Sequence, residues 1–242
     1  MTEEPELELT IMLPAYREAE ALDLLLPGLK RVAAQLAPAH EILVIDSQSP
    51  LDRTPEVCRT HQVVHVSRQG GNAYGDAVRT GIRAARGRYI LTMDADGSHN
   101  PDFLSKLWDQ REQCDIVIGS RYVSGGGTEN PWVLIFLSYL VNMVFRVVLG
   151  LRCHDVSNSL RLYRREHLRD LQLRATDFDI IEEILVKLCS GTRRCRVLEV
   201  PIVFERRKAG QSKRNLVWFA LGYLFTLGRL LRFKIAARVE RG

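Results

Sequence analysis

Several features that mark other classes of protein are missing from this sequence of 242 residues. Its five cysteines include no Cys-x-x-Cys pair, which argues against a disulfide framework or a zinc site and predicts reduced thiols. There is no internal repeat or low-complexity tract, and the N-terminal residues lack the basic and apolar regions of a signal peptide. We therefore expect a folded protein that stays in the cytosol where it is made.

Acidic residues are scarce near the C-terminus. Residues 206–241 hold ten Lys or Arg and a single acid, Glu240, whereas acids slightly outnumber bases in the rest of the chain. A basic segment on a mildly acidic body favours a polyanionic partner, either nucleic acid or an anionic membrane surface.

Two apolar segments favour the membrane. The run from Pro131 to Leu151 is interrupted only by Ser138, Asn142 and Arg146. It is long enough to span a bilayer, but its polar residues favour a helix that lies in the interface or packs beside the site. The segment 215–232 carries aromatic residues and is followed by bases, which is typical of an in-plane membrane helix. The alternative for 215–232 is a core helix with a solvated basic tail.

The first half of the chain alternates between short apolar runs and helical patterns. The runs predict strands at 7–13, 41–45, 63–66, 89–92 and 115–119, and helices at 19–36, 54–61, 76–86 and 102–110. Such alternation predicts an α/β fold with a largely parallel sheet covered by helices on both faces. A dinucleotide-binding unit is a rival, but Gly70, Gly71 and Gly75 do not fit the spacing Gly-x-Gly-x-x-Gly.

The stretch from Arg88 to Pro101 contains the most informative pair of residues. The apolar run 89–92, together with Met93, delivers Asp94 and Asp96 to the carboxyl end of a strand, where open α/β sheets bind ligands. Two carboxylates separated by one small residue suit a hard divalent cation, which keeps open positions for the phosphates of a nucleotide. On its spacing alone, the same stretch also fits a plain surface turn.

Six motifs, taken together, place this pair in a known context. They are Pro14-Ala-Tyr-Arg-Glu18, Asp46, Asp94-Ala-Asp96, Gly119-Ser-Arg-Tyr122, Ser157-Asn-Ser-Leu-Arg161, and Glu199-Val-Pro continuing to Gly210-Gln-Ser-Lys213. In this order they resemble the family 2 glycosyltransferases and, more narrowly, the dolichol- or polyprenyl-phosphate mannose synthase branch. The resemblance covers about residues 7–213 and implies an A-type glycosyltransferase fold, which is Rossmann-like with a mostly parallel sheet.

The resemblance also implies roles for particular residues. The base and ribose of a nucleoside diphosphate sugar would be held by Pro14, Tyr16, Glu18 and Asp46. The diphosphate would be bridged by Mg²⁺ or Mn²⁺ on Asp94 and Asp96, with Ser98 as a further ligand. Positive charge near the acceptor phosphate or the donor would come from Arg121, Arg207 and Lys213. The residues that the resemblance makes catalytic are Asp96, Arg121 and Arg207.

The sequence departs from the family pattern at several positions. Asp46 is followed by Ser47 where paired aspartates are common, and Leu51 looks like an insertion of one residue. Tyr74 stands near the place where relatives commonly have lysine, and the segment 132–145 is uncharged where the mannose synthases tend to carry bases. The first two departures bear on the nucleotide base, and the last bears on the acceptor.

A lipid phosphate acceptor simplifies the expected chemistry. Its oxygen is already anionic at neutral pH, so charge control is needed and a dedicated general base is not, and in-line attack predicts inversion at the anomeric carbon. A soluble enzyme acting on a hydroxyl would instead need a carboxylate base, for which Asp155, Glu182 and Glu183 are the candidates. A non-catalytic membrane-bound scaffold is the alternative of another class.

These observations predict an enzyme at the cytoplasmic face of a membrane, bound as a peripheral or monotopic protein. Residues 1–214, including the apolar helix 131–151, form the catalytic domain, and residues 215–242 form a basic amphipathic helix that associates with the membrane. The expected partners are a nucleoside diphosphate sugar, a polyprenyl phosphate and the membrane surface, with no nucleic acid. The sequence leaves open which sugar, which base and which oligomeric state.

Overall fold

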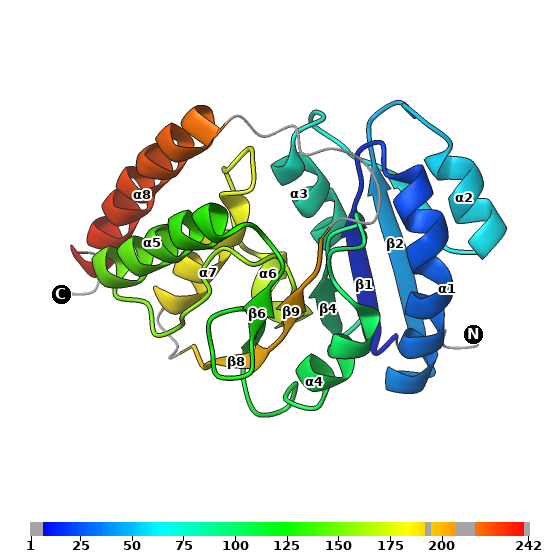
Figure 1. The fold of residues 1–242 in the computed structure, drawn as a ribbon, viewed down its shortest axis with the longest axis horizontal. Coiled ribbons are helices and arrows are strands. Elements are labelled where there is room, and N and C mark those ends of the chain that lie inside the picture. The colour runs from blue at the N-terminus through cyan, green and yellow to red at the C-terminus, as the bar shows by residue number, and fades with distance from the viewer. Residues whose placement is uncertain (1–6, 192–194, 207–215, 240–242) are drawn as a thin grey trace.

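A seven-stranded sheet forms the centre of the protein in the computed structural model, which describes residues 7–191, 195–206 and 216–239 (Figure 1). The strands follow the order β3-β2-β1-β4-β7-β5-β8. Their bounds are β1 Leu9–Pro14, β2 His40–Asp46, β3 Val64–Ser67, β4 Tyr89–Thr92, β5 Ile116–Ser120, β7 Arg161–Arg164 and β8 Val197–Pro201. The predicted α/β class and mostly parallel sheet are confirmed.

The strand order creates a switch point between β1 and β4. From β1 the chain moves outward through β2 to β3, and it then returns to place β4 on the other side of β1, with all of these pairs parallel. Loops that leave the carboxyl ends of two strands in opposite directions leave room for a ligand between them. The loops after β1 and β4 are those that carry Glu18 and Asp94.

The helices α1, α2 and α3 follow the first three strands and agree with the predicted positions. They span Ala19–Leu36, Thr54–His61 and Tyr74–Ala84. Side chains along β1 alternate between the two faces of the sheet. Leu9, Ile11 and Leu13 belong to the apolar core that includes α1, whereas Met12 belongs to the core that includes α3. Each face of the sheet is therefore covered.

After β4 the structure departs further from the prediction. The expected helix at 102–110 is a short 3₁₀ turn, Pro101–Phe103, followed by α4, Leu104–Trp108. No strand is predicted at β7, which lies antiparallel between β4 and β5. This strand of four residues begins and ends with arginine, and Arg161 is fully buried. Its charged residues hide the apolar alternation by which a strand is recognised.

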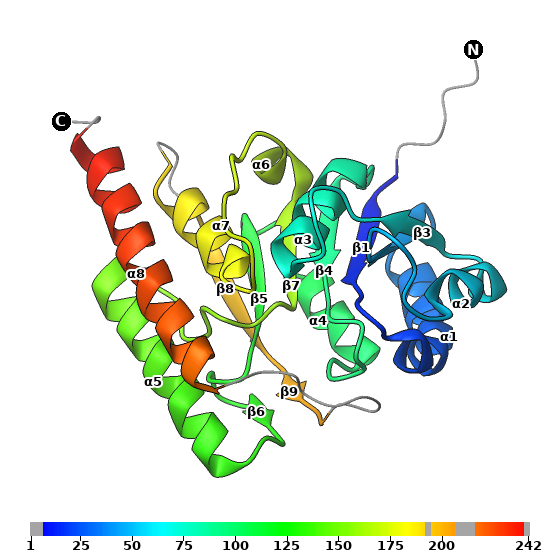
Figure 2. The ribbon, with the colours of Figure 1, turned by 90° about the horizontal axis from the view of Figure 1, so that it is seen from above.

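The remaining elements complete the half that contains β5 and β8. They are α5 Trp132–Leu149, α6 Arg165–Arg169, α7 Ile180–Cys189, α8 Leu216–Val239 and a small second sheet of β6 Gly127–Thr128 with β9 Val203–Phe204. Helices α5 and α8 lie side by side at the end of the molecule opposite α1 and α2 (Figures 1 and 2). Among the described residues, α5 is the one helix long and apolar enough to cross a membrane.

We predict that Gly87→Ala destabilises the fold and that Gly28→Ala does not. A Cβ atom at Gly87 would lie 2.5 Å from the backbone nitrogen of Thr10 and 2.6 Å from the carbonyl carbon of Leu9, so β1 would have to move. Overpacking of this kind costs about 1–3 kcal/mol. Gly28 lies within α1 with nothing near its Cβ position, so alanine there should stabilise the protein by about 0.5–1 kcal/mol. Urea unfolding of both variants tests the contrast, and equal effects would contradict it.

Candidate functional site

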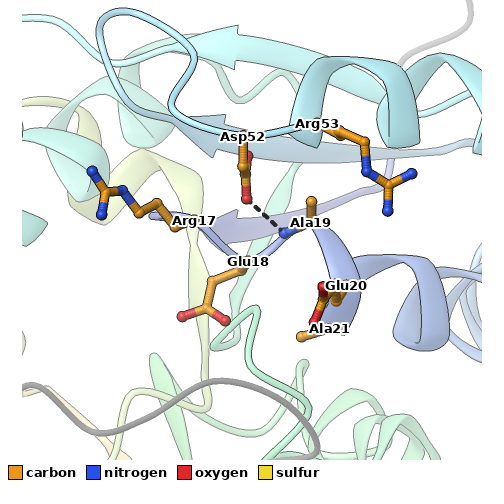
Figure 3. Close-up of a pocket in the computed structure, with 7 residues that line it drawn as sticks. All are labelled: Arg17, Glu18, Ala19, Glu20, Ala21, Asp52 and Arg53. Carbon is orange, nitrogen blue, oxygen red and sulfur yellow. Dashed lines mark hydrogen bonds between the residues drawn. The ribbon is translucent and has the colours of Figure 1, made fainter.

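The loop after β1 borders an open pocket of about 310 Å³ (Figure 3). Pro14 is the last residue of β1, and Tyr16 is 40% exposed on the loop. Glu18 lines the pocket, and its neighbour Arg17 has a left-handed backbone with φ of 57°. Asp52 lines the pocket as well. Its carboxylate accepts hydrogen bonds from the backbone nitrogens of Ala19 and Thr54, which are the first residues of α1 and α2.

Asp46 lies at the carboxyl end of β2 and is fully buried. Its Oδ1 atom accepts a hydrogen bond of 2.7 Å from the backbone nitrogen of Ser47, and its Oδ2 atom lies 3.2 Å from Nε2 of His65 on β3. Ser47, which replaces a second aspartate, also donates its hydroxyl to the carbonyl of Ser49. The Asp46 carboxylate is thus engaged in a buried local network with Ser47 and His65.

Arg68 holds three of these loops together, and sequence reasoning missed it. The side chain is 4% exposed and donates to the backbone carbonyls of Ala15 after β1, Asp46 after β2, and Asn72 and Ala73 in the glycine loop. Its guanidinium also lies 5.7 Å from the ring centre of Tyr16. Burial lowers the pKa of Arg68, and nearby acids and tyrosines oppose this effect. No local pattern marks such a residue, because two of the carbonyls that it joins, those of Asp46 and Ala15, lie 22 and 53 residues away in the sequence.

Asp94 and Asp96 follow β4 in a tight turn. Oδ1 of Asp96 accepts hydrogen bonds from the backbone nitrogen of Ser98 at 3.0 Å and from its hydroxyl at 2.5 Å. Oδ1 of Asp94 accepts a hydrogen bond of 3.3 Å from the hydroxyl of Tyr74, whose ring stacks on Phe178 at 4.2 Å. Tyr74, one of the departures from the family pattern, therefore orients the first carboxylate of the pair.

His99 connects this turn to the opposite side of the site. The backbone nitrogen of Asp94 donates to Nδ1 of His99 at 3.4 Å, so Nδ1 is an acceptor. Nε2 lies 3.0 Å from Oδ1 of Asn158, whose own Nδ2 donates to the carbonyl of Gly119. Nε2 therefore carries the proton, and the ring is fully buried as the neutral Nε2–H tautomer. The importance of His99 depends on Asn158, which is too distant in sequence for a motif to reveal.

Arg121 follows β5 and forms a bidentate ion pair with Asp155. Nε and Nη2 of Arg121 each lie 2.8 Å from a different oxygen of that carboxylate, and the backbone nitrogen of Arg121 donates to it at 3.0 Å. Asp155 also accepts from the backbone nitrogen of Asn158. Burial would raise the pKa of Asp155, but the charge and hydrogen bonds of Arg121 outweigh it and hold the pKa below its ordinary value.

The structure thus links the carboxylates predicted to bind the metal with the arginine predicted to bind the acceptor phosphate. Asp94 reaches Arg121 through His99, Asn158 and Asp155, each joined to the next by a hydrogen bond. The other two predicted cations, Arg207 and Lys213, lie outside the described residues.

Comparison with known proteins identifies the family. The model of the family described as glycosyl transferase family 2 matches residues 10–172. A polyprenol monophosphomannose synthase from Mycolicibacterium smegmatis is 36% identical over 88% of this chain and 83% of its own length.

The chain belongs to glycosyl transferase family 2.

Two other relatives of this family 2 glycosyltransferase have comparable names. An undecaprenyl-phosphate mannosyltransferase from Micrococcus luteus is 34% identical over 84% of this chain and 86% of its own length. A dolichol-phosphate mannosyltransferase from Pyrococcus furiosus is 32% identical over 86% of this chain but only 59% of its own length. The resemblance seen in the motifs is confirmed.

Solved structures with lower sequence identity share the fold. Glucosyl-3-phosphoglycerate synthase from Mycobacterium tuberculosis, in complex with Mn²⁺, UDP-glucose and phosphoglyceric acid, is 17% identical with a TM-score of 0.72 over 93% of this chain and 79% of its own. The same enzyme with Mg²⁺ and UDP is 18% identical with a TM-score of 0.67, over 97% of this chain and 79% of its own. These likenesses confirm the A-type glycosyltransferase fold.

The three carboxylates that the sequence offers as a general base for this glycosyltransferase are Asp155, Glu182 and Glu183. Each is either paired with a cation or buried. Asp155 is paired with Arg121. Glu183 accepts from the backbone nitrogens of Arg174 and Ala175 and pairs with Lys187 at 2.8 Å. Glu182 is 1% exposed, in the field of the buried Arg161 guanidinium. None of the three is placed to take a proton from a substrate that binds at the surface.

We predict that Arg121→Gln destabilises the protein in a way that depends on pH. In the wild type, the lowered pKa of Asp155 contributes stability above its ordinary value of 3.8, and that contribution is lost only as the pH falls through the lowered value. Without Arg121 the carboxylate is buried and unpaired, which costs about 3–5 kcal/mol at neutral pH. The loss should shrink in acid as Asp155 becomes protonated.

Urea unfolding between about pH 3 and pH 7.5 measures this difference. Arg31→Gln is the matched control, because Arg31 pairs with Asp102 at 3.3 Å on the surface, where both side chains are more than half exposed. A loss of stability for Arg121→Gln that is small, or constant over the whole range, would contradict the structural role of the pair.

Proposed function

We propose that this glycosyltransferase moves a hexose from a nucleoside diphosphate sugar to a polyprenyl phosphate at the cytoplasmic face of a membrane, with inversion at the anomeric carbon. Three relatives at 32–36% identity are named as mannose synthases or mannosyltransferases of polyprenol, undecaprenyl phosphate or dolichol phosphate. Mannose is therefore the hexose to test first. The structural observation that carries the proposal is the exposed apolar stripe of α5, a helix whose Tyr139 ring contacts that of Tyr122, next to Arg121.

The donor would bind across the switch point between β1 and β4. Glu18 offers a carboxylate in the pocket, Tyr16 offers an exposed aromatic ring two residues before it, and Asp46 lies buried at the end of the neighbouring strand β2. Asp94 and Asp96 stand on the other side, at the end of β4. A nucleoside diphosphate sugar would bind with its nucleoside near Tyr16 and Glu18 and with its diphosphate near Asp94 and Asp96.

The residues at the end of β4 fit a divalent cation. Asp94 and Asp96 supply hard oxygen ligands, which Mg²⁺ and Mn²⁺ prefer. The described residues contain no group of three or more His, Cys, Asp and Glu that could hold a metal, so diphosphate oxygens and water would complete the coordination. When bound, the cation would offset the charge of the departing nucleoside diphosphate. The Ser98 hydroxyl, a third candidate ligand, holds Asp96 in place in this structure.

The acceptor would bind where Arg121 emerges from β5. An arginine held by Asp155 is oriented for a phosphate, and a phosphate oxygen is already anionic at neutral pH. The enclosed positions of Asp155, Glu182 and Glu183 disfavour the alternative of a hydroxyl acceptor, which needs a base. The proposed acceptor role of Arg121 joins those of Arg207 and Lys213, which remain predictions from the sequence.

Helix α5 supports a location in the plane of the membrane surface. A stripe at helical spacing is exposed, comprising Trp132, Phe136, Leu140, Met143 and Val147, with Trp132 at 77% and Val147 at 72%. The opposite face is buried at Asn142, Phe145 and Leu149 against the catalytic domain. A helix docked along its side on a folded domain cannot be surrounded by lipid, so α5 fits the interface better than a span. Exposed Phe225 and Ile235 on α8 extend the apolar surface.

We predict that Asp96→Asn lowers sugar transfer by more than about 100-fold, since charge stabilisation by a metal is worth several kcal/mol. Transfer is measured with Mn²⁺, several nucleoside diphosphate sugars, those of mannose first, and undecaprenyl phosphate, followed by extraction of the lipid. Thermal unfolding should show an intact fold. Asp102→Asn, on the surface beyond the turn, is the control and should transfer normally.

The acceptor class is decided by the same assay. Labelled sugar that partitions into the lipid phase supports the proposal. Sugar that appears only on a soluble hydroxyl acceptor, with none in the lipid, would contradict it and favour the soluble enzyme. No transfer by the folded wild-type protein to any acceptor would favour the non-catalytic scaffold.

We predict that replacing Trp132 and Phe136 together by alanine weakens binding to vesicles. Burial of each side chain in the interface is worth about 1.5–3 kcal/mol, so the double variant should partition at least roughly 100-fold less well. Flotation with vesicles of phosphatidylcholine and phosphatidylglycerol measures the change. Leu24→Ala is the control, because Leu24 is 68% exposed on α1 at the opposite end of the molecule. Equal flotation of all three proteins would contradict membrane binding through α5.

A further inference from the structure

The docked face of α5 makes hydrogen bonds to the loop that contains Asp155. Asn142, which is 1% exposed, lies at their centre. Its Oδ1 atom accepts from the backbone nitrogens of Val156 at 2.7 Å and Ser157 at 3.2 Å. Its Nδ2 atom donates to the carbonyl of Ser138, one turn earlier in α5, at 2.8 Å. The amide that interrupts the apolar run is therefore used entirely inside the protein.

The same amide reaches Arg121 through one hydroxyl. Oγ of Ser157 lies 3.2 Å from Nδ2 of Asn142 and accepts a hydrogen bond of 3.0 Å from Nη2 of Arg121. Nη2 is also one of the two nitrogens that bind Asp155. A displacement of α5 would consequently be transmitted to the guanidinium by two short polar contacts.

The other end of this loop is anchored in the sheet. Glu199 on β8 accepts from the backbone nitrogens of His154 at 2.7 Å and Asp155 at 2.9 Å. The loop 154–158 is thus attached to the sheet through Glu199 on the edge strand β8, through Asn158 to the carbonyl of Gly119 on β5, and through Arg161 on β7. It is attached to α5 through Asn142, and this attachment is the one that can respond to what happens on the exposed face of the helix.

Helix α5 is held to the domain by few buried side chains, namely Asn142, Phe145 and Leu149. An element with so small a buried surface opens at a lower free-energy cost than the core does. A bilayer that covers the exposed stripe from Trp132 to Val147 would favour the position in which that stripe faces lipid and Asn142 faces the loop. In that position of α5, the membrane contacts one face of the helix and the loop 154–158 contacts the opposite face.

We propose that Asn142 is a positioning residue that couples the seating of α5 on a membrane to the placement of Arg121 at the acceptor phosphate. This inference rests on the proposed function and adds a regulatory property to it. A membrane surface raises the activity of the site itself, apart from delivering the lipid acceptor. Coupling between two sites typically changes affinity or population by about 5–150-fold.

The test separates these two effects of the membrane by using a soluble acceptor. Transfer to geranyl phosphate, a short prenyl phosphate, is measured with and without vesicles of phosphatidylcholine and phosphatidylglycerol that contain no acceptor. For the wild type, vesicles should stimulate transfer at least about fivefold. Asn142→Leu should float with vesicles as the wild type does but should lose the stimulation. Met143→Ala, on the exposed stripe, is the matched control and should keep the stimulation at saturating vesicle concentration.

A second variant covers the case in which Asn142→Leu does not fold. Ser157→Ala removes the hydroxyl between Asn142 and Arg121 while leaving the Oδ1 contacts with the loop. It should lose most of the stimulation. Stimulation of Asn142→Leu or Ser157→Ala equal to that of the wild type would overturn the proposal, as would a wild type that vesicles do not stimulate.

Hydrogen exchange provides a readout that does not depend on activity. The backbone amides of Val156 and Ser157 donate to Asn142, so vesicles should slow their exchange in the wild type and should not do so in Asn142→Leu. Equal exchange with and without vesicles in the wild type would overturn the coupling. If the wild type transfers sugar to neither prenyl phosphate, the proposed function fails, and the exchange measurement still decides whether α5 and the loop are coupled.

Discussion

The bidentate pair of Arg121 with Asp155 is the contact through which the separate parts of this site are held together. Asp155 is buried, so its charge is tolerated only because Arg121 and two backbone nitrogens bind it. Around the pair are Asn158, which leads through His99 to the turn of Asp94, and Ser157, which leads to α5. The order of the loop 154–158 thus governs both sides of the reaction centre.

The fold brings this pair to the place where a nucleotide sugar would arrive. Parallel strands β1, β2 and β4 end at one edge of the sheet, and the order in which strands are added reverses between β1 and β4, which is where open α/β sheets bind ligands. Arg68 ties the three loops on the β1–β3 side with hydrogen bonds to backbone carbonyls. Loops that are held by hydrogen bonds on both sides would place charge accurately, which matters most for the proposed transfer to a phosphate, because that transfer needs no base.

Much of the first half of the fold could be predicted because its signals are local. The helices at 19–36 and 54–61 begin and end where the pattern indicates, and each predicted strand there is present. The prediction missed β7. In this strand Arg161 is buried at a position where an apolar residue would be expected. Its guanidinium donates hydrogen bonds to the carbonyls of Val156, Asn158 and Ile181. The polar residues of α5 are evident in the sequence, but the face that they occupy is decided by how the helix docks on the domain.

The sequence by itself determined the chemical character of the site. Asp94 and Asp96 at the end of an apolar strand, Arg121 after the next one, and two apolar segments near basic residues all follow from neighbours in the chain. Only the tertiary structure decided which acids are engaged, that His99 and Arg68 matter, and that Asn142 faces inward. The physical reason is that burial and hydrogen bonding depend on partners tens of residues away, whereas charge and hydropathy are properties of the residue itself.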